Sequence, residues 1–506
     1  MFSKILIANR GEIAVRIIRA CREMGIRSAA VYSEADRESL HVPMADEAHP
    51  IGPAAPAESY LNIQTLVDTC VKCGADAVHP GYGFLSEQAP FAEACGAAGA
   101  TFIGPSPETL RCAGDKIASR AVAEAAGVPV IPGAVPEGAA PEEDDAGAWR
   151  DEAGRLGYPV LIKAAVGGGG RGMRRAAGPR DIEDALASAR AEARAAFGNG
   201  LLYLEKMLPD ARHVEVQILG DGRGGAIHLG ERECSIQRRH QKVFEETPAP
   251  GLSPGMREEI LSAAVRLASG MNYRGAGTVE FLLPDEGGFY FLEINARLQV
   301  EHPITEMATG QDLVALQIRI AAEGRLPIAQ DEVRFSGYAI EARLYAEDPA
   351  RDFLPQTGTI RALHLPTGDG VRVDAGIAPG IAVGADYDPL LAKIVVWGED
   401  RATALDRLEG ALAGLRLSGL RTNQAFLAAV ARHPAFRSGA FSTDFIEHNA
   451  GELGGEIAGD RMADAKIAAV LGVYLSENKP AGPGPEGGRR HDPWDRVGGW
   501  LPGGLE

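Results

Sequence analysis

The sequence predicts an α/β protein whose N-terminal part is a doubly wound parallel sheet. Residues 4–8 form a continuous apolar strand, residues 12–24 have the apolar spacing of a helix, and residues 28–32 begin another strand. Residues 77–80 and 101–104 contain further strand ends, each with Pro or Gly at its close. Strands separated by helices of this length pair in parallel, and their C-terminal loops are expected to carry ligand contacts.

The rest of the chain mixes helices with alternating strands, so the predicted class becomes α+β in part. Residues 158–166 read as a strand that runs into glycines, and residues 180–197 as an alanine-rich helix. Strands alternate from about residue 201, and a mixed segment covers residues 333–447. Residues 132–154 are rich in Pro, Ala, Gly and acid, which predicts a mobile surface connection.

Composition narrows the functional classes. The net charge of −18 over 506 residues argues against a nucleic-acid partner, which demands a basic face. No apolar run reaches the roughly 18–20 residues that span a bilayer, so we expect no membrane partner, and the N-terminal apolar stretch reads as a strand rather than a signal peptide. The six cysteines are scattered, and Cys70 and Cys73 form a lone CxxC, so we expect neither a disulfide framework nor a zinc or redox motif. These features predict a reducing, cytoplasmic location.

The glycine run at residues 167–172 satisfies GxGxxG, but a dinucleotide site also needs a helix that opens directly from the loop. Here residues 173–175 continue as a strand, and the helix begins only after Pro179. A glycine hairpin that closes over phosphates fits better, with Lys163 in the preceding strand as a phosphate contact. No Gly-Lys dipeptide occurs, which excludes a Walker A loop. A plain flexible turn is the alternative.

Residues 289–301 carry the most informative chemical pattern. Side chains of an extended chain alternate between faces, which places on one face Glu293, Asn295, Arg297, Gln299 and Glu301. A turn after residues 277–283 predicts a hairpin that brings Glu280 beside Glu293. Adjacent carboxylates repel unless a cation lies between them, and two carboxylates with an amide oxygen suit Mg²⁺. A solvated polar face is the alternative.

A second polar pattern precedes these acids in the sequence. His213, Glu215 and Gln217 alternate along one strand, and residues 231–242 form a dense polar and basic segment that ends in Lys242. The chain has nine lysines against 42 arginines, so each lysine is of interest where a compact ammonium matters. We expect an anion pocket beside the metal and nucleotide, with a solvated charged face as the alternative.

Several motifs resemble the biotin carboxylase family of the ATP-grasp superfamily, and the resemblance covers about residues 1–448. The motifs are Ile-Ala-Asn-Arg-Gly-Glu-Ile-Ala (7–14), His-Pro-Gly-Tyr-Gly-Phe-Leu-Ser-Glu (79–87), Ile-Gly-Pro (103–105), Gly-Asp-Lys (114–116), the glycine run to Met173, Arg-Arg-His-Gln-Lys (238–242), Gly-Ala-Gly-Thr (275–278), Gln-Val-Glu-His-Pro (299–303) and Ala-Glu-Asp-Pro (346–349). The implied division is an N-terminal domain at residues 1–114, an ATP-grasp domain at 115–332 with a lid at about 135–204, a C-terminal domain at 333–448, and a helical or disordered tail at 449–506.

The resemblance also implies roles for individual residues. ATP would be contacted by Lys116, Lys163, Gly169, Gly170, Glu205, Lys206, Leu208, His213, His240 and Glu280. Two Mg²⁺ or Mn²⁺ ions would be held by Glu280, Glu293 and Asn295. Bicarbonate and biotin would be held by Lys242, Arg297, Gln299, Val300 and Arg343. Glu301 would be the general base, assisted by Lys242, Arg297 and Arg343, and Arg343 would face the biotin ureido oxygen.

The implied reaction is the carboxylation of biotin with ATP and bicarbonate, through carboxyphosphate. No Ala-Met-Lys-Met biotinylation motif occurs, so biotin is expected on a separate carrier protein or domain, with a carboxyltransferase subunit and a homodimer as further partners. Residues 353–358 and the tail at 492–500 are similar to acyl-CoA carboxylases, the tail to the methylcrotonyl-CoA type. The alternatives are another ATP-grasp carboxylate ligase, or a nucleotide-binding scaffold without catalysis.

Overall fold

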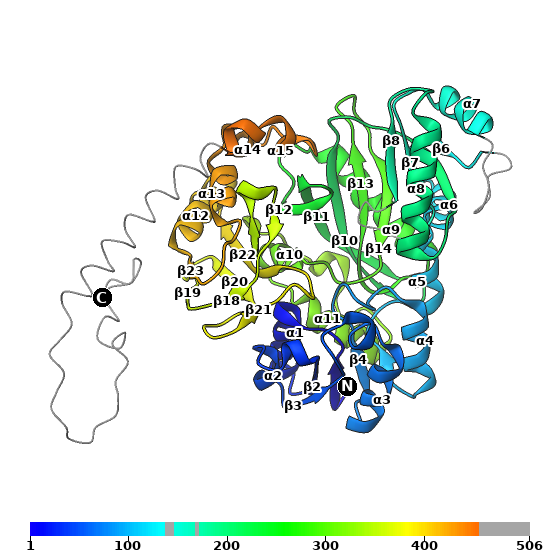
Figure 1. Cartoon of the computed structure of the whole chain (residues 1–506). Helices are drawn as coiled ribbons and strands as arrows, with labels where there is room; N and C mark the ends of the chain where they lie inside the picture. Colours follow the sequence, from blue (N-terminus) through cyan, green and yellow to red (C-terminus); the bar gives the residue numbers. More distant parts are fainter. Residues whose placement is uncertain (137–145, 167–171, 455–506) are drawn as a thin grey trace, which may run out of the picture.

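The computed structural model describes residues 1–136, 146–166 and 172–454. Three groups of elements pack against one another (Figure 1). The N-terminal group, in blue, lies below the cyan and green elements of the centre and the yellow and orange elements of the C-terminal part. Within the described ranges, no helix combines the length and the apolar character needed to cross a membrane.

The N-terminal sheet has five parallel strands in the order β3-β2-β1-β4-β5. The strands are β1 (Lys4–Ile7), β2 (Arg27–Tyr32), β3 (Glu47–Pro50), β4 (Ala77–His79) and β5 (Thr101–Phe102), and the helices are α1 (Gly11–Glu23), α2 (His41–Met44), α3 (Ile63–Cys73), α4 (Ala89–Ala97) and α5 (Pro107–Gly114). Ile5 and Ile7 enter one core with α1, whereas Leu6 enters another with α3 and α4. Helices on both faces confirm the predicted doubly wound parallel sheet.

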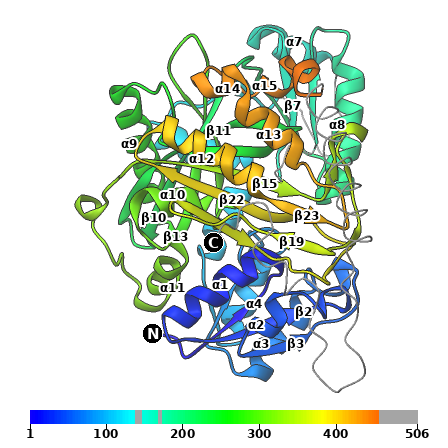
Figure 2. The ribbon, with the colours of Figure 1, turned by 90° about the vertical axis from the view of Figure 1, so that its left-hand side faces the viewer.

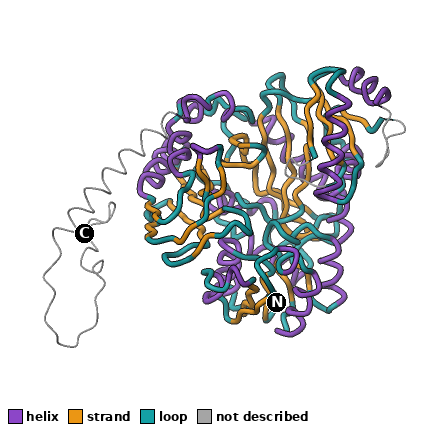
Figure 3. The backbone as a smooth tube through the Cα atoms, viewed as in Figure 1, coloured by secondary structure: helices purple, strands orange, loops and turns teal. Residues whose placement is uncertain are grey.

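A smaller antiparallel sheet of order β6-β9-β7-β8 forms the lid region. Its elements are β6 (Gly133–Ala134), α7 (Ala146–Leu156), β7 (Val160–Ala164), β8 (Met173–Ala176), α8 (Ile182–Phe197) and β9 (Leu202–Lys206), and α6 (Lys116–Ala125) precedes them. Helix α8 packs along the strands (Figure 1 and Figure 3). The predicted surface connection at residues 132–154 is wrong in part, because α7 buries Trp149 and Ala153 one turn apart in the lid's own core. As predicted, a strand rather than a helix follows the glycine run.

An eight-stranded antiparallel sheet of order β14-β13-β10-β11-β12-β15-β22-β20 runs through the centre. Its strands are β10 (Arg212–Asp221), β11 (Ala226–Arg238), β12 (Gln241–Thr247), β13 (Arg274–Leu283), β14 (Tyr290–Asn295), β15 (Tyr338–Tyr345), β20 (Val371–Ala375) and β22 (Leu390–Gly398). Helices α9 (Pro254–Gly270), α10 (His302–Thr309) and α11 (Leu313–Glu323) accompany it. Because β12 pairs with β15, the sheet continues across the sequence boundary that we placed at residue 332.

The C-terminal part covers the β15–β22 end of this sheet. Helix α12 (Arg401–Gly414) packs on β22 and β15 (Figure 2), and α13 (Gln424–Arg432), α14 (Pro434–Ser438) and α15 (Phe445–His448) follow it. Short strands complete this part: β16 (Glu347–Asp348), β17 (Leu354–Pro355), β18 (Gly358–Thr359), β19 (Ala362–His364), β21 (Ala382–Val383) and β23 (Arg416–Ser418). Most of the predicted tail, from residue 455, lies outside the described residues.

Candidate active site

A buried carboxylate, Glu280, faces a half-buried one, Glu293, across the β13–β14 hairpin. Glu280 and Glu293 are paired residues in the ladder, as the alternation predicted, and Glu280 is also paired with Glu215 of β10. The amide of Asn295 donates a hydrogen bond of 2.6 Å to Glu280 Oε1. Carboxylate oxygens of Glu215 and Glu280 and a ring nitrogen of His213 lie within 4.8 Å of one another. The carboxylate oxygens of Glu280 and Glu293 and the amide oxygen of Asn295 have the chemistry that Mg²⁺ or Mn²⁺ requires.

Protein cations neutralise these acids in the structure. Lys116 Nζ, at the start of α6, lies 2.6 Å from Glu293 Oε2. His213 Nε2 lies 2.6 Å from Glu280 Oε2, and Lys242 Nζ lies 3.0 Å from Glu280 Oε1. Burial opposes ionisation, but Lys116 and its neighbours lower the pKa of Glu293 to about 2, and Lys242 and His213 lower the pKa of Glu280. Both carboxylates are therefore ionised and available to a divalent cation at neutral pH.

The predicted strand over residues 289–301 ends early. Strand β14 stops at Asn295, and Arg297 and Gln299 lie in the loop that leads to α10. The alternation of side chains between two faces ends there because the chain turns and places Glu301 at the N-cap of α10. The helix dipole favours a carboxylate at that position. The loop residues still face the acids: Arg297 donates to Gln299 Oε1 at 2.7 Å, and Gln299 donates to Glu280 Oε1 at 3.2 Å.

Glu301 is fully buried between two cations. Lys242 Nζ lies 2.8 Å from its Oε1, and Arg343 Nη2 lies 2.8 Å from its Oε2. Burial and the nearby Glu215 disfavour its charge, but Lys242 and Arg343 keep the pKa of Glu301 below its ordinary value. The structure thus provides an ionised carboxylate of fixed orientation, next to the acids of the β13–β14 hairpin.

Sequence reasoning missed Glu245, the second acid on Arg343. Its Oε1 lies 2.5 Å from Arg343 Nη2, and it is the ladder partner of Glu341 on β15. Burial raises the pKa of Glu245 to about 7 and that of Glu341 well above its usual value. No local pattern could reveal this group, because it depends on the pairing of strands about a hundred residues apart.

Lys393 was also missed, although the scarcity of lysine was a signal for it. Its side chain is fully buried, and Nζ donates to the carbonyl of Val300 at 2.9 Å. The same ammonium lies 3.2 Å from Glu12 Oε1 in α1 and 3.8 Å from Asp374 Oδ2. Lys393 therefore ties the loop before Glu301 to the N-terminal domain.

Three of the residues predicted for the nucleotide, Lys163, Glu205 and Lys206, lie on the lid strands β7 and β9. Lys163 of β7 forms an ion pair with Glu205 of β9, and Arg120 Nη1 lies 3.0 Å from the same carboxylate. Lys206 Nζ donates to the carbonyl of Gly157 at 2.6 Å. Leu208 is half-buried beyond β9, and His240 lies in the exposed turn between β11 and β12 with φ of 65°. Gly169 and Gly170 lie outside the described residues.

Comparison with known families gives a match along the chain. Residues 1–110 match the biotin carboxylase N-terminal domain, residues 115–329 the ATP-binding domain of the carbamoyl-phosphate synthase L chain, and residues 341–448 the biotin carboxylase C-terminal domain. The biotin carboxylase of Nostoc sp. is 50% identical over 446 residues, which cover 88% of this chain and 99% of that protein. The chain belongs to the biotin carboxylase family. The central match alone would also suit another ATP-grasp ligase, and the two flanking matches decide between them.

Other biotin carboxylases and related subunits show the same likeness. The methylcrotonoyl-CoA carboxylase subunit alpha of Mus musculus is 47% identical over 473 residues, or 93% of this chain, but the chain spans only 65% of that subunit. The biotin carboxylase domain dimer of Hydrogenobacter thermophilus 2-oxoglutarate carboxylase, solved with MgADP, ADP and bicarbonate, superposes with a TM-score of 0.86 at 44% identity and covers 90% of this chain and 99% of its own. The Campylobacter jejuni biotin carboxylase gives 0.85 at 43% identity, covering 88% of this chain and 99% of its own.

Proposed function

We propose that the chain carboxylates biotin with ATP and bicarbonate, and that the residues assigned above perform this reaction. The observation that carries the proposal is the buried Glu301 carboxylate, clamped by Lys242 and Arg343 next to the acids of the β13–β14 hairpin. A base at this position can take a proton from a small acid bound by cations. A related domain was solved with MgADP and bicarbonate, which supports the same ligands here.

Glu301 would remove the bicarbonate proton while a bicarbonate oxygen attacks the γ-phosphate and ADP leaves. Lys242, Arg297, Gln299 and Val300 would hold the anion. Lys116 and Lys163 would exchange their present carboxylate partners for phosphate oxygens, with Lys206, Leu208, Glu205, His213 and His240 on the nucleotide side. The lid, with Gly169 and Gly170, would exclude water from the carboxyphosphate formed.

Carboxyphosphate would then break its C–O bond to the phosphoryl group and release CO₂ and phosphate. The phosphate would take the proton from biotin N1′, and the N1′ anion would attack CO₂ to form the N–C bond of carboxybiotin. Arg343 would stabilise the charge on the ureido oxygen, and losing such a donor costs about 100–1,000-fold in rate. Glu280, Glu293 and Asn295 would hold Mg²⁺ or Mn²⁺, whose charge neutralises phosphoryl oxygens when bound.

The partners are part of the proposal. Because the sequence has no biotinylation motif, biotin would arrive on a carrier protein or domain, and a carboxyltransferase would consume the product. A homodimer is supported by the dimeric domain of the 2-oxoglutarate carboxylase. The likeness to methylcrotonoyl-CoA carboxylase suggests an acyl-CoA acceptor. A reducing, cytoplasmic location is supported by the six unpaired cysteines. We also retain the division into domains at residues 1–114, 115–332 and 333–448, with the lid at 135–204 and the tail at 449–506.

The test is ADP release by the purified chain with Mg-ATP, with and without bicarbonate, and then with free biotin added. We expect release that requires bicarbonate, rises with biotin and is lost in Glu301→Gln and Arg343→Ala. Glu323→Gln and Arg319→Ala are matched controls, because these residues pair with each other on the surface of α11. Release that ignores both bicarbonate and biotin would contradict the proposal and leave an ATP-grasp ligase with another acceptor. If ATP binds but no ADP is released, the result would favour a nucleotide-binding scaffold without catalysis.

A further inference from the structure

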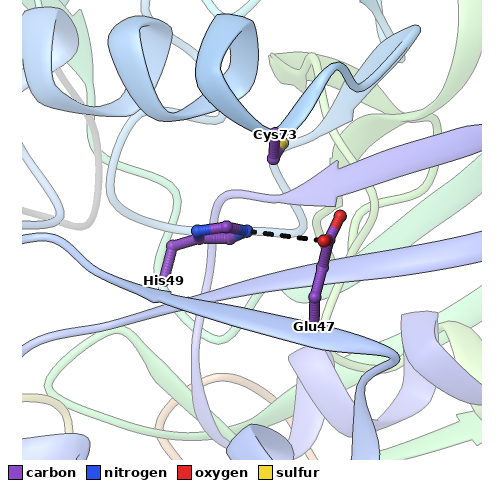
Figure 4. A group of neighbouring side chains, drawn as sticks. All are labelled: Glu47, His49 and Cys73. Atoms are coloured by element: carbon purple, nitrogen blue, oxygen red, sulfur yellow. Dashed lines mark ion pairs between the residues drawn. The ribbon is translucent and has the colours of Figure 1, made fainter.

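Three side chains of types that bind metal ions meet at the edge of the N-terminal sheet (Figure 4). Glu47 and His49 are alternate residues of the edge strand β3, so they project from the same face. Cys73 is the last residue of α3 and brings its thiol to that face. A carboxylate oxygen, an imidazole nitrogen and the thiol sulfur all lie within 4.8 Å of one another, and all three residues are half-buried.

The hydrogen bonds around this cluster leave side-chain atoms available to bind a metal ion. His49 Nε2 is buried, lies 4.0 Å from Glu47 Oε2, and has no hydrogen-bond partner among the described residues. Lys4 Nζ lies 2.6 Å from the other oxygen, Oε1, of Glu47 and donates to the carbonyl of Cys73 at 2.6 Å. The Cys73 thiol donates to the carbonyl of Cys70 at 3.3 Å. A buried ring nitrogen without a partner is costly, and a cation bound between the three side chains would satisfy it.

We propose that Glu47, His49 and Cys73 bind one Zn²⁺ ion, with water as the fourth ligand, although the lone CxxC at Cys70 and Cys73 did not by itself predict a zinc site. Sulfur, imidazole nitrogen and carboxylate oxygen together suit Zn²⁺, whereas Mg²⁺ selects oxygen ligands. Zinc–ligand bonds are about 2.0–2.3 Å long, so atoms that share one ion lie closer together than the 4.8 Å within which these three atoms lie. The side chains therefore draw together on binding. The Cys73 S–H bond breaks, an S–Zn bond forms, and the proton leaves to solvent.

The position of the cluster makes it structural rather than catalytic. Glu47 begins β3 and Cys73 lies shortly before β4, so the cluster lies at the N-terminal ends of the parallel strands. The ligand-binding loops of such a sheet are at the opposite, C-terminal ends. A bound ion would join edge strand β3 to α3 and so hold a strand that has a partner on one side only. This inference is independent of the function proposed above.

Calorimetric titration of Zn²⁺ into the whole chain, with excess Mg²⁺ to occupy the catalytic acids, tests the proposal. We expect one zinc per chain. A residue that only hydrogen-bonds a metal ligand is worth about 10–100-fold in metal affinity. Cys73→Ser and His49→Gln remove the ligands themselves, so each should weaken zinc binding by at least about 100-fold. Cys112→Ser and His364→Gln change the same residue types outside the cluster and should bind zinc like the wild type.

Replacing zinc with Co²⁺ tests whether the Cys73 sulfur binds the metal ion. The Co²⁺-loaded protein should show a thiolate-to-cobalt absorption band that disappears in Cys73→Ser and persists in Cys112→Ser. Thermal melting in a chelator establishes that the variants fold, and added zinc should raise Tm only where all three ligands are present. No zinc bound, or binding and a cobalt band unchanged in Cys73→Ser, would overturn the proposal. Zinc that binds equally well to all variants would be adventitious.

Discussion

Lys242 provides the sharpest test of how the site ionises its base. Its ammonium lies 2.5, 3.0 and 2.8 Å from carboxylate oxygens of Glu215, Glu280 and Glu301. Unit charges 4 Å apart attract by about 4 kcal/mol at an effective dielectric constant of about 20. The Lys242→Met change removes this attraction from all three buried carboxylates, while Arg232 stays paired with Glu215 and Arg343 with Glu301.

The expected result follows from the sign of the pKa change. In the wild type, Lys242 and Arg343 oppose burial and hold the pKa of Glu301 low, so the base is ionised throughout the neutral range. Without Lys242, Glu301 takes up a proton at higher pH. One pH unit corresponds to about 1.4 kcal/mol, well below the attraction lost, so the acidic limb of the pH–rate profile should move to higher pH by at least about one unit.

The assay is bicarbonate-dependent ADP release measured from pH 5 to 9, with Mg-ATP and bicarbonate saturating at each pH. Lys242→Arg is the matched control, because it keeps the charge while changing the shape of the donor. That variant should lose rate but keep the acidic limb near its wild-type position. An unshifted limb in Lys242→Met, at a measurable rate, would show that Lys242 does not set the ionisation of the base.

Three further predictions concern stability, each read as Tm. Lys393→Met leaves Glu12 without its buried cation and should lower the free energy of unfolding by about 3–5 kcal/mol. The double variant that also carries Glu12→Gln should recover part of this stability. A Tm change within experimental error would refute a structural role for Lys393. Burial raises the pKa of Glu293, but Lys116 outweighs it and the pKa falls from 4.5 to about 2. The contribution of this carboxylate to metal-free stability should therefore be complete above pH 4.5 and lost towards pH 2, and an equal acid slope in Glu293→Gln would contradict this. Gly376→Ala would place a Cβ 2.4 Å from the backbone nitrogen of Glu12 and should cost about 1–3 kcal/mol, whereas an unchanged Tm would show that the domains separate easily there.

Local periodicity predicted the elements whose apolar and polar positions follow the period of a strand or a helix. The apolar strand at residues 4–8 and the helix after it appear as β1 and α1, and the hairpin that pairs Glu280 with Glu293 forms in the expected register. Prediction failed where tertiary contacts override periodicity. Strand β14 ends at Asn295 although the polar alternation continues, because Glu301 must reach Lys242 and Arg343 from the start of a helix.

The sequence by itself determined which chemical groups are present: a hairpin of acids, a scarce lysine after a basic segment, and motifs similar to those of biotin carboxylases. Only the tertiary structure decided how these groups neutralise one another. Lys242, Glu301 and Arg343 come from β12, the N-cap of α10 and β15, and they meet because β12 pairs with β15 while α10 packs against both. The same holds for Glu47 and Cys73, which the edge of the N-terminal sheet brings together. Such meetings depend on packing between distant segments, since the energy of a buried charge depends on every group around it and not on its sequence neighbours.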